Sequence, residues 1–269
     1  MEHNNDAIRQ ENRKAMPKFI AIMVVSLLAG IALGFALVFL SQGDFAGALA
    51  AAGLFFTTKV AGWLLIACPI VELAVCLPIY FGAKKRLAGW DGEDETVSDK
   101  IEAKLSVCIW ITGMELIASF FLLAAMTSGF INNVGTEREM SPVMFFGGTA
   151  AFLIGGLFVS VIFQQKLVDT TKKLNPEKHG SVYDTKFQKK WMDGCDEAER
   201  AVIGQCSLKA YQAMCRVCLV LWAVFALGGM FFNWGFLPAM AVCIVWGAGQ
   251  SVYFYWGMKL SKPGSPSVY

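Results

Sequence analysis

The stretch VAGWLLIACPIVELAVCLPIYF, residues 60–81, contains a single charged side chain, Glu72. An α-helix needs about 20 apolar residues to cross the roughly 30 Å hydrocarbon core of a bilayer, because it rises about 1.5 Å per residue. Basic residues follow directly at Lys84, Lys85 and Arg86. The stretch therefore predicts a transmembrane helix that ends at a positively charged loop.

Further apolar runs repeat this pattern along the chain of 269 residues. The chain is 56% hydrophobic and only 16% charged, whereas soluble domains carry about 25% charged residues. Backbone polar groups in lipid must find their partners within the same segment, which requires helices. We predict an all-α polytopic membrane protein with about six transmembrane helices arranged as three hairpins, over residues 19–40, 60–81, 105–129, 143–163, 213–232 and 236–256.

Lys and Arg residues are divided unequally between the connections. All except Lys59 and Arg138 fall in the N-terminal arm, in the loops 82–104 and 164–212 with the start of the fifth span, or near the C-terminus. Because positive residues of short loops stay on the cytoplasmic side, both termini and the two large loops are predicted to be cytoplasmic. Residues 1–260 are expected to form one membrane domain, and residues 261–269 a flexible tail.

Residues 47–56, between the first two spans, are apolar but too few to cross a membrane. We expect them either to lie at the outer interface or to lengthen the second helix.

Glu72 and Glu115 are carboxylic acids inside apolar runs. Each lies about ten residues from the cytoplasmic end of its span, or about 15 Å deep, so the two are able to meet at one depth. An ionised carboxylate in lipid costs on the order of 3 kcal/mol, and two in contact titrate as a coupled pair. Such a pair suits a proton relay or a cation site. The alternative is two neutral acids, each bonded to a neighbouring helix through a group such as Thr112 or Ser119.

Two prolines lie in the second span. Pro69 and Pro78 each remove one backbone hydrogen bond, which predicts a helix break of the kind found at some transport sites, although prolines are also common in membrane helices without that role. Close helix packing is predicted at Gly30 and Gly34, which lie four residues apart on one helix face. The same spacing of small residues occurs in the fourth span, where it ends at Gly155.

The two large loops share the acidic pattern D-G-x-D-E, each copy ahead of a helix that enters the membrane. The copies contain Asp91, Gly92, Asp94 and Glu95 in the first loop, and Asp193, Gly194, Asp196 and Glu197 in the second. One interpretation is an internal duplication of a hairpin unit. The other is helix capping, because acidic residues suit the first turn of a helix. Asp196 and Glu199 have the spacing of a capping box.

Sequence motifs of nucleotide-binding loops, hydrolase nucleophiles and zinc proteases do not occur, and the apolar runs contain no histidine. Cys215 and Cys218 have no second cysteine pair at zinc-finger spacing. We therefore expect no enzymatic activity, no catalytic residue, no metal and no cofactor. The net charge of +2 does not indicate nucleic acid as a partner.

Two separated segments carry a resemblance to a known family. Residues 11–19 (ENRKAMPKF) resemble the opening of an uncharacterised family of multi-pass membrane proteins from Firmicutes, a domain of unknown function. Residues 183–191 (YDTKFQKKW), followed by residues 195–199 (CDEAE) and 209–211 (KAY), are similar to that family's second characteristic segment. The resemblance implies a bacterial cell membrane and the same six-helix plan, and it implies no activity.

Two functions remain open at this point. The first is a non-enzymatic membrane component, held in the lipid bilayer, that acts through its cytoplasmic loops on a cytoplasmic or membrane protein partner, since residues 164–212 form a large charged segment. The alternative is a small transporter or ion-coupled permease subunit that uses Glu72 and Glu115.

Overall fold

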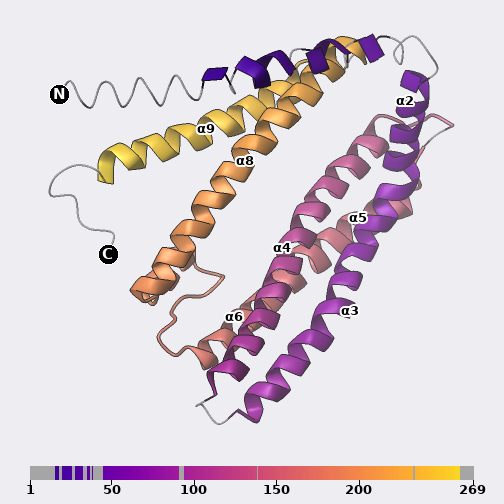
Figure 1. The fold of residues 1–269 in the computed structure, drawn as a ribbon. Coiled ribbons are helices and arrows are strands. Elements are labelled where there is room, and N and C mark those ends of the chain that lie inside the picture. Colours follow the sequence, from indigo (N-terminus) through magenta and orange to yellow (C-terminus); the bar gives the residue numbers. More distant parts are fainter. Residues whose placement is uncertain are drawn as a thin grey trace, which may run out of the picture. The chain divides into compact units, whose positions relative to one another are not determined.

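The structure, a computed structural model, describes residues 16–17, 20–25, 28–32, 35–36, 38, 45–90, 94–137, 139–232 and 234–260. All regular elements within these residues are helices (Figure 1). Five helical segments there are long and apolar enough to cross a membrane: Gly47–Ala88, Thr96–Ile131, Pro142–Leu174, Glu197–Phe231 and Leu237–Trp256. This confirms the all-α fold, with helices that are compatible with a membrane protein. The predicted span 19–40 is described only in part, so the count of six and the position of the termini stay predictions.

The second predicted span belongs to one long helix. Helices α2 (Phe45–Phe55), η1 (Phe56–Val60) and α3 (Ala61–Ala88) follow one another without interruption, and the backbone at their junctions stays helical. Residues 47–56 therefore lengthen the second helix. The helix break predicted at Pro69 and Pro78 is wrong, because α3 continues through both prolines and each removes a single backbone donor. The helix leaves regular α geometry at η1 instead, where it widens to a π-helix.

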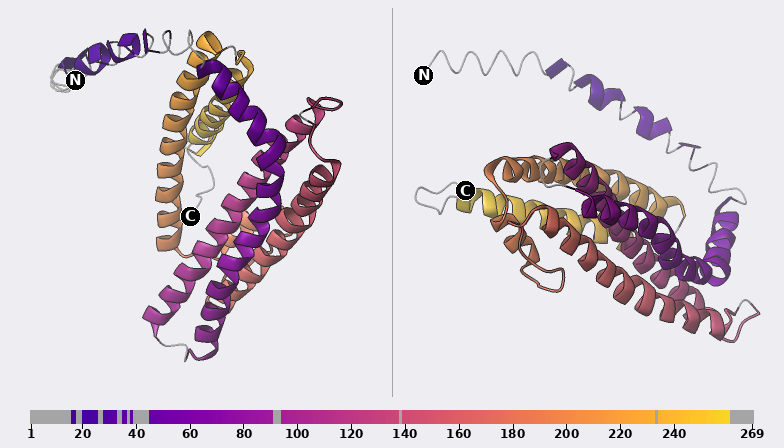
Figure 2. Two further views of the ribbon diagram at one scale, coloured as in Figure 1. Left: turned by 90° about the vertical axis from the view of Figure 1, so that its right-hand side faces the viewer. Right: turned by 90° about the horizontal axis from the view of Figure 1, so that it is seen from below.

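Two further helical segments complete the central bundle. Helix α4 (Glu95–Ile131) follows α3 after a short connection, and α5 (Pro142–Ala151), η2 (Phe152–Val159) and α6 (Ser160–Leu174) form the next continuous segment. The stretch η2 is a second π-helical widening. Helices α3, α4 and the α5–η2–α6 segment pack side by side (Figures 1 and 2).

The predicted loops are largely helical. Because α3 continues to Ala88 and α4 begins at Glu95, residues 82–88 and 95–104 of the first connection are helical. The connection 164–212 contains the end of α6, the short α7 (Phe187–Asp193) and the start of α8 (Glu197–Phe231). The predicted loop bounds mark the ends of the apolar runs. A helix can extend beyond its apolar run into water, as long as its hydrogen bonds and caps permit.

The described residues divide into two compact units. Unit 2, Ala51–Leu208, holds the central bundle and the connection from α6 to the start of α8. Unit 1 comprises the described residues of Met1–Ala50 and Lys209–Val268, with most of α8 and α9 (Leu237–Leu260). The single membrane domain expected over residues 1–260 stays a prediction, because helices of one membrane domain can pack in two groups.

Helices α8 and α9 of unit 1 contact each other through polar and aromatic side chains. The rings of Tyr211 and Tyr253 stack with centroids 4.8 Å apart, and Gln250 Nε2 donates to Cys215 Sγ at 3.6 Å. The turn between the helices contains Gly235 with φ +74°, a backbone conformation that glycine adopts without steric cost.

The core of unit 2 consists of two hydrophobic clusters. One joins α3, α4 and α6 near the loop 89–94: Cys76, Tyr80, Ala83, Ile101, Leu105, Cys108, Phe163, Leu167 and Leu174. The other lies toward the opposite ends of the same helical segments: Ala61, Leu65, Leu122, Met126, Met140 and Phe152. The polar and charged residues between these clusters form the candidate site.

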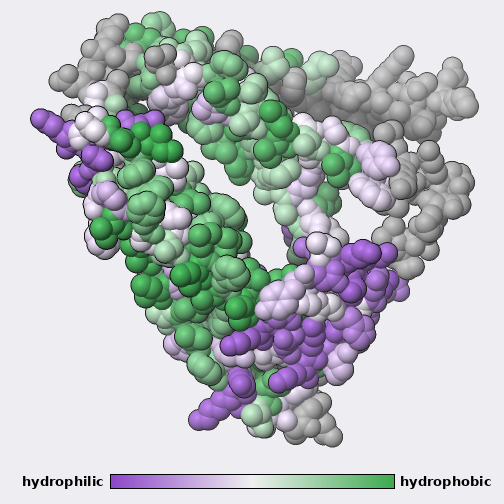
Figure 3. Space-filling model, turned by 180° about the vertical axis from the view of Figure 1, so that it is seen from behind, coloured by the Kyte–Doolittle hydropathy of each residue, from purple (hydrophilic) through white to green (hydrophobic). Residues whose placement is uncertain are grey.

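The two ends of unit 2 differ in charge. Lys59 lies in η1, which packs beside the end of α4, because a Cβ on Gly129 would meet the carbonyl oxygen of Thr57. The opposite end carries most of the basic residues of the bundle: Lys84, Lys85, Arg86, Lys100, Lys104, Lys166, Lys172 and Lys173. Figure 3 shows hydrophobic surface over the helices and hydrophilic surface at their ends. Which end faces the cytoplasm stays a prediction from the charge pattern.

Candidate functional site

Glu72 of α3 and Glu115 of α4 line one pocket of about 440 Å³ between the two helices. Both side chains are buried, with exposed fractions of 3% and 8%. The rest of the wall is apolar and includes Val71, Trp110 and Met114. The structure thus brings the two acids together at one place in the bundle. Their role as a proton or cation site stays a prediction.

Ser160 at the start of α6 holds Glu72. Its Oγ lies 2.5 Å from Glu72 Oε2 and 3.1 Å from the carbonyl oxygen of Gly155. A hydroxyl group carries one hydrogen, so two separate hydrogen bonds at Ser160 Oγ require a protonated Glu72. Glu72 then donates to Ser160, and Ser160 donates to Gly155. If Glu72 were ionised, the two acceptor oxygens would have to share the single hydroxyl hydrogen of Ser160. The geometry therefore favours a neutral Glu72.

The π-helical stretch η2 positions that serine. The backbone N–H of Ser160 donates to the carbonyls of Gly155 and Leu157, and the bond to Gly155, five residues earlier, has the hydrogen-bond spacing of a π-helix. Wide turns of this kind occur often at functional sites. The N–H and the hydroxyl of Ser160 both contact the Gly155 carbonyl, and the hydroxyl oxygen also contacts Glu72.

Glu115 is held within its own helix. Ser119, one turn further along α4 and fully buried, lies with its Oγ 2.6 Å from Glu115 Oε1. Thr112, one turn earlier, instead accepts a hydrogen bond from Gln164 Nε2 at 3.0 Å, which links α4 to α6. Of the two groups expected to bond the acids, Ser119 does so and Thr112 does not. The bond between neighbouring helices comes from Ser160.

Each acid keeps one oxygen without a partner. Glu72 Oε1 and Glu115 Oε2 are buried and have no hydrogen bond within the described part of the chain. A buried polar atom that stays unpaired costs about 1–3 kcal/mol. A proton, an ion or a ligand donor that pairs with these oxygens therefore removes this cost and binds favourably here. Sequence reasoning found the two acids because they are charged residues in apolar runs. It missed Ser160, which lies 88 residues from Glu72 and is an ordinary residue in a membrane helix.

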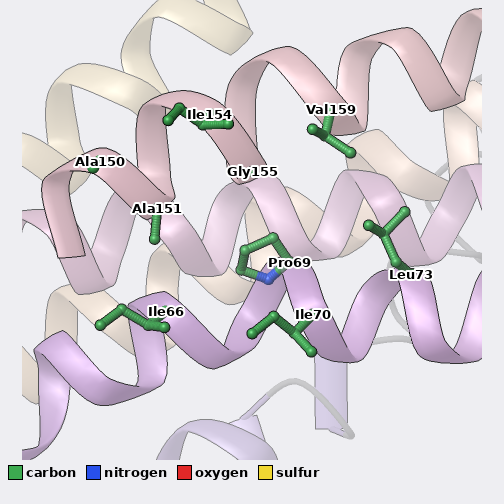
Figure 4. A pocket seen from close by; sticks show the side chains of 9 residues that line it. All are labelled: Ile66, Pro69, Ile70, Leu73, Ala150, Ala151, Ile154, Gly155 and Val159. Carbon is green, nitrogen blue, oxygen red and sulfur yellow. The ribbon is translucent and has the colours of Figure 1, made fainter. Parts of the chain in front are cut away.

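Pro69 and Gly155 fit against each other beside the acids. A Cβ on Gly155 would lie 2.7 Å from both Cβ and Cγ of Pro69, and Figure 4 shows the proline ring directed at this part of η2. The small residue lets α3 and η2 approach closely, as its spacing predicts. At Gly30 nothing lies within 4 Å of a Cβ position, and Gly34 is outside the described residues, so packing at that pair stays a prediction.

The first copy of the acidic pattern contains a helix cap. Asp94 precedes α4, and its Oδ1 accepts hydrogen bonds from the Thr96 N–H at 2.9 Å and the Thr96 hydroxyl at 2.8 Å. These bonds favour the ionised form and lower the pKa of Asp94. Glu95 is the first residue of the helix, whereas Asp91 and Gly92 are outside the described residues.

The second copy forms the predicted capping box at the start of α8. Glu199 N–H donates to Asp196 Oδ1 at 2.8 Å, and Asp196 N–H donates to Glu199 Oε2 at 3.1 Å. Asp193 offers its carbonyl to Arg200, and Glu197 begins the helix. Capping is thus confirmed for Asp94 and Asp196. The internal duplication stays a prediction.

A buried lysine organises the connection between α6 and α8, and sequence analysis missed it. Lys178 is 5% exposed, forms an ion pair with Glu199, donates to Cys195 Sγ at 3.2 Å and lies 6.0 Å from the ring centroid of Trp191. Burial lowers the pKa of Lys178, but the hydrogen bonds to Glu199 and Cys195 and their charges outweigh it, and the pKa is raised. Gly194 is required here, because a Cβ would lie 2.3 Å from the Glu177 carbonyl oxygen.

The connection is also fixed to the ends of the bundle helices. Gln165 Oε1 accepts hydrogen bonds from the Ser181 hydroxyl at 2.9 Å and the Val182 N–H at 2.7 Å, and Asn175 donates to Glu102 of α4. Residues 175–195 therefore form an ordered polar cap on one end of unit 2.

Comparisons of the chain with protein-family models, with curated proteins and with solved structures find no match. The resemblance of residues 11–19 and 183–191 to an uncharacterised bacterial family therefore stays an expectation from the sequence. Function is inferred from the geometry of the site alone.

Proposed function

We propose that this protein is an integral multi-pass membrane protein that binds and releases a proton or a cation at Glu72 and Glu115, as a small transporter or an ion-coupled permease subunit. The observation that carries the proposal is the shared pocket. Each of the two buried carboxyl groups has one oxygen on a serine, and its other oxygen has no partner among the residues that the structure describes.

The energy of the pair depends on what occupies it. One ionised carboxylate inside a membrane costs on the order of 3 kcal/mol, and a second one nearby adds repulsion. Protonation of the pair, or binding of a cation, removes this cost. An ion-coupled carrier needs a site whose charge changes when a proton or cation binds. Loading and unloading then change the stability of the surrounding helices.

Infrared difference spectroscopy tests the proposal. The full chain in lipid nanodiscs is titrated with acid and base while the carboxylic C=O stretching band of protonated, buried acids is recorded. We expect a band that titrates with pH and that loses intensity in Glu72→Gln and in Glu115→Gln. Glu139→Gln, which removes an exposed carboxyl group, is the matched control and leaves the buried band unchanged. A spectrum without a titrating buried band, or one that neither pocket variant alters, refutes the proposal.

A second candidate is a non-enzymatic component that acts through its cytoplasmic loops. The observation that favours it is the ordered polar cap at residues 175–195, in which Lys178 is buried while Lys186, Lys189 and Lys190 remain exposed. Cross-linking in native membranes, with wild type and with the three exposed lysines changed to glutamate, tests it. A partner that is captured only by the wild-type chain supports this function, and identical capture by both chains contradicts it.

The location that we propose is a bacterial cell membrane with both termini in the cytoplasm. The division of basic residues between loops supports the orientation, and the sequence resemblance supports the source. Labelling of single cysteines placed in the segment 84–104 with a membrane-impermeant reagent tests the orientation. Labelling of intact cells at these positions would contradict it.

A further inference from the structure

We infer that the pocket at Glu72 and Glu115 binds a lipophilic amine, that is, a protonated ammonium group on an apolar body, which enters from the side between α3 and α4. The inference rests on the proposed function and names the ligand class of the same site. It is argued from the access to the pocket, from its free acceptor atoms and from its wall.

Access along the bundle is closed by hydrophobic core. On α3, Glu72 lies between Leu65 of one cluster and Cys76 of the other, both fully buried, and the same order holds on α4 and along the α5–η2–α6 segment. A hydrated ion that arrived from either end would have to pass through one of these clusters. The pocket instead opens on the flank of unit 2, at a rim where Trp110 is 64% exposed and Val71 57% exposed. An apolar rim on a membrane-spanning helix pair admits a molecule that partitions into lipid.

The free atoms of the pocket are hydrogen-bond acceptors. Glu72 Oε1 and Glu115 Oε2 have no partner within the described residues, and both side chains are more than nine-tenths buried. An ammonium group offers up to three N–H donors and one positive charge, so it can satisfy both oxygens and compensate the ionised pair. A neutral alcohol offers one donor and no charge. An anion would be repelled.

The size and wall of the pocket suit an apolar body. A volume of about 440 Å³ falls within the range of about 300–1,000 Å³ typical of small-molecule sites. Apart from the acids, the lining is aliphatic, aromatic or sulfur-containing, with Cys68 and Met114 near the carboxyl groups and Trp110 at the rim. An aromatic face beside a cation adds a favourable electrostatic contact.

Protons and the amine compete for the same oxygens. Among the described residues, the other titratable groups beside the pair are Cys68, near Glu115, and Cys76, near Glu72, with Cys108 of α4 next to Cys76. From α6 the pair meets Ser160, which does not titrate. Lowering the pH loads the acids with protons and displaces the amine, whose own charge is unaffected in that range. Binding of the amine therefore releases protons.

The test measures saturable binding of tritiated diphenylpropylamine to the full chain in lipid nanodiscs by scintillation proximity. We expect binding at neutral pH that weakens as the pH falls, and competition by unlabelled amine but not by the uncharged isostere diphenylpropanol. The double variant Glu72→Gln/Glu115→Gln should bind roughly ten- to a hundred-fold more weakly, because charge-assisted hydrogen bonds are lost. Glu139→Gln is the control and should bind as wild type does.

A rim variant keeps the test decisive if the double variant does not fold. Trp110→Ala removes a mostly exposed side chain and leaves the buried acids in place, so we expect binding about two- to five-fold weaker. Wild-type binding in the double variant overturns the inference, as does equal competition by the alcohol. If the double variant does not fold, wild-type binding in Trp110→Ala overturns it. If the infrared band titrates but no saturable amine binding occurs, this inference fails and the proposed function stands. If the band does not titrate, the proposed function fails.

Discussion

Replacing Ser160 with alanine removes the hydroxyl group that joins Glu72 to the backbone of η2. If Glu72 is neutral, two hydrogen bonds are lost together: the one that the acid donates to Ser160 Oγ and the one that Ser160 donates to Gly155. A net hydrogen bond contributes about 0.5–1.5 kcal/mol in proteins, and about 0.6 kcal/mol on average between membrane helices. We expect Ser160→Ala to lower the free energy of unfolding by about 1–2 kcal/mol.

The companion variant Glu72→Gln tests the charge state behind this estimate. An amide donates an N–H to Ser160 as the protonated acid donates its O–H, so Glu72→Gln should change the free energy of unfolding by less than about 0.5 kcal/mol. Both variants are compared by unfolding in mixed micelles with increasing sodium dodecyl sulfate, followed by circular dichroism. Ser207→Ala, which removes a hydroxyl bonded only within its own helix, is the control. A loss in Glu72→Gln as large as that in Ser160→Ala would refute a neutral Glu72.

Three further predictions concern packing and the polar ends of the bundle. Gly155→Ala should lower the free energy of unfolding by about 1–3 kcal/mol, because its Cβ would lie 2.7 Å from the rigid ring of Pro69, whereas Gly147→Ala, with its nearest neighbour at 3.9 Å, should not. Lys178→Ala should speed trypsin cleavage within residues 175–195, measured by limited proteolysis. The raised pKa of Lys178 means that its contribution is complete below about pH 10 and is lost as the pH rises through the folded value. Asp94 has a lowered pKa, so its cap is complete above about pH 4 and weakens as the pH falls through the folded value. Asp94→Asn should keep the cap and remove this pH dependence, as checked by acid titration of the helical signal.

The sequence predicted the membrane character and the two acids because both depend on simple counts. A run of apolar residues of sufficient length is a direct consequence of bilayer thickness, and a carboxylate inside such a run is conspicuous because ionised side chains are costly there. The depth of Glu72 and Glu115 followed from the rise per residue of a helix. The capping role of Asp196 followed from its spacing to Glu199.

The rest depends on contacts between segments far apart in the chain. Ser160 contacts Glu72 only because α6 packs against α3. The π-helical turns that orient Ser160 cannot be predicted from the residue types of η2. The charge pattern did not single out Lys178, because a buried lysine and a solvated lysine cannot be told apart in the sequence. The structure shows that it is buried beside Glu199 and Cys195. The prolines of α3 misled for a related reason: one lost backbone bond does not end a helix whose neighbours hold it in place.

The wide turn of η2 makes the direction of one side chain depend on helix winding. Successive residues of an α-helix are rotated by about 100°, so rewinding η2 by one residue would swing Ser160 away from the acid by that angle and return the Gly155 carbonyl to the residue before it. Tightening η2 to an α-helix would therefore also break the contact between Ser160 and Glu72. The segment that would turn is α6, which runs from Ser160 to Leu174 and leads to the polar cap at residues 175–195.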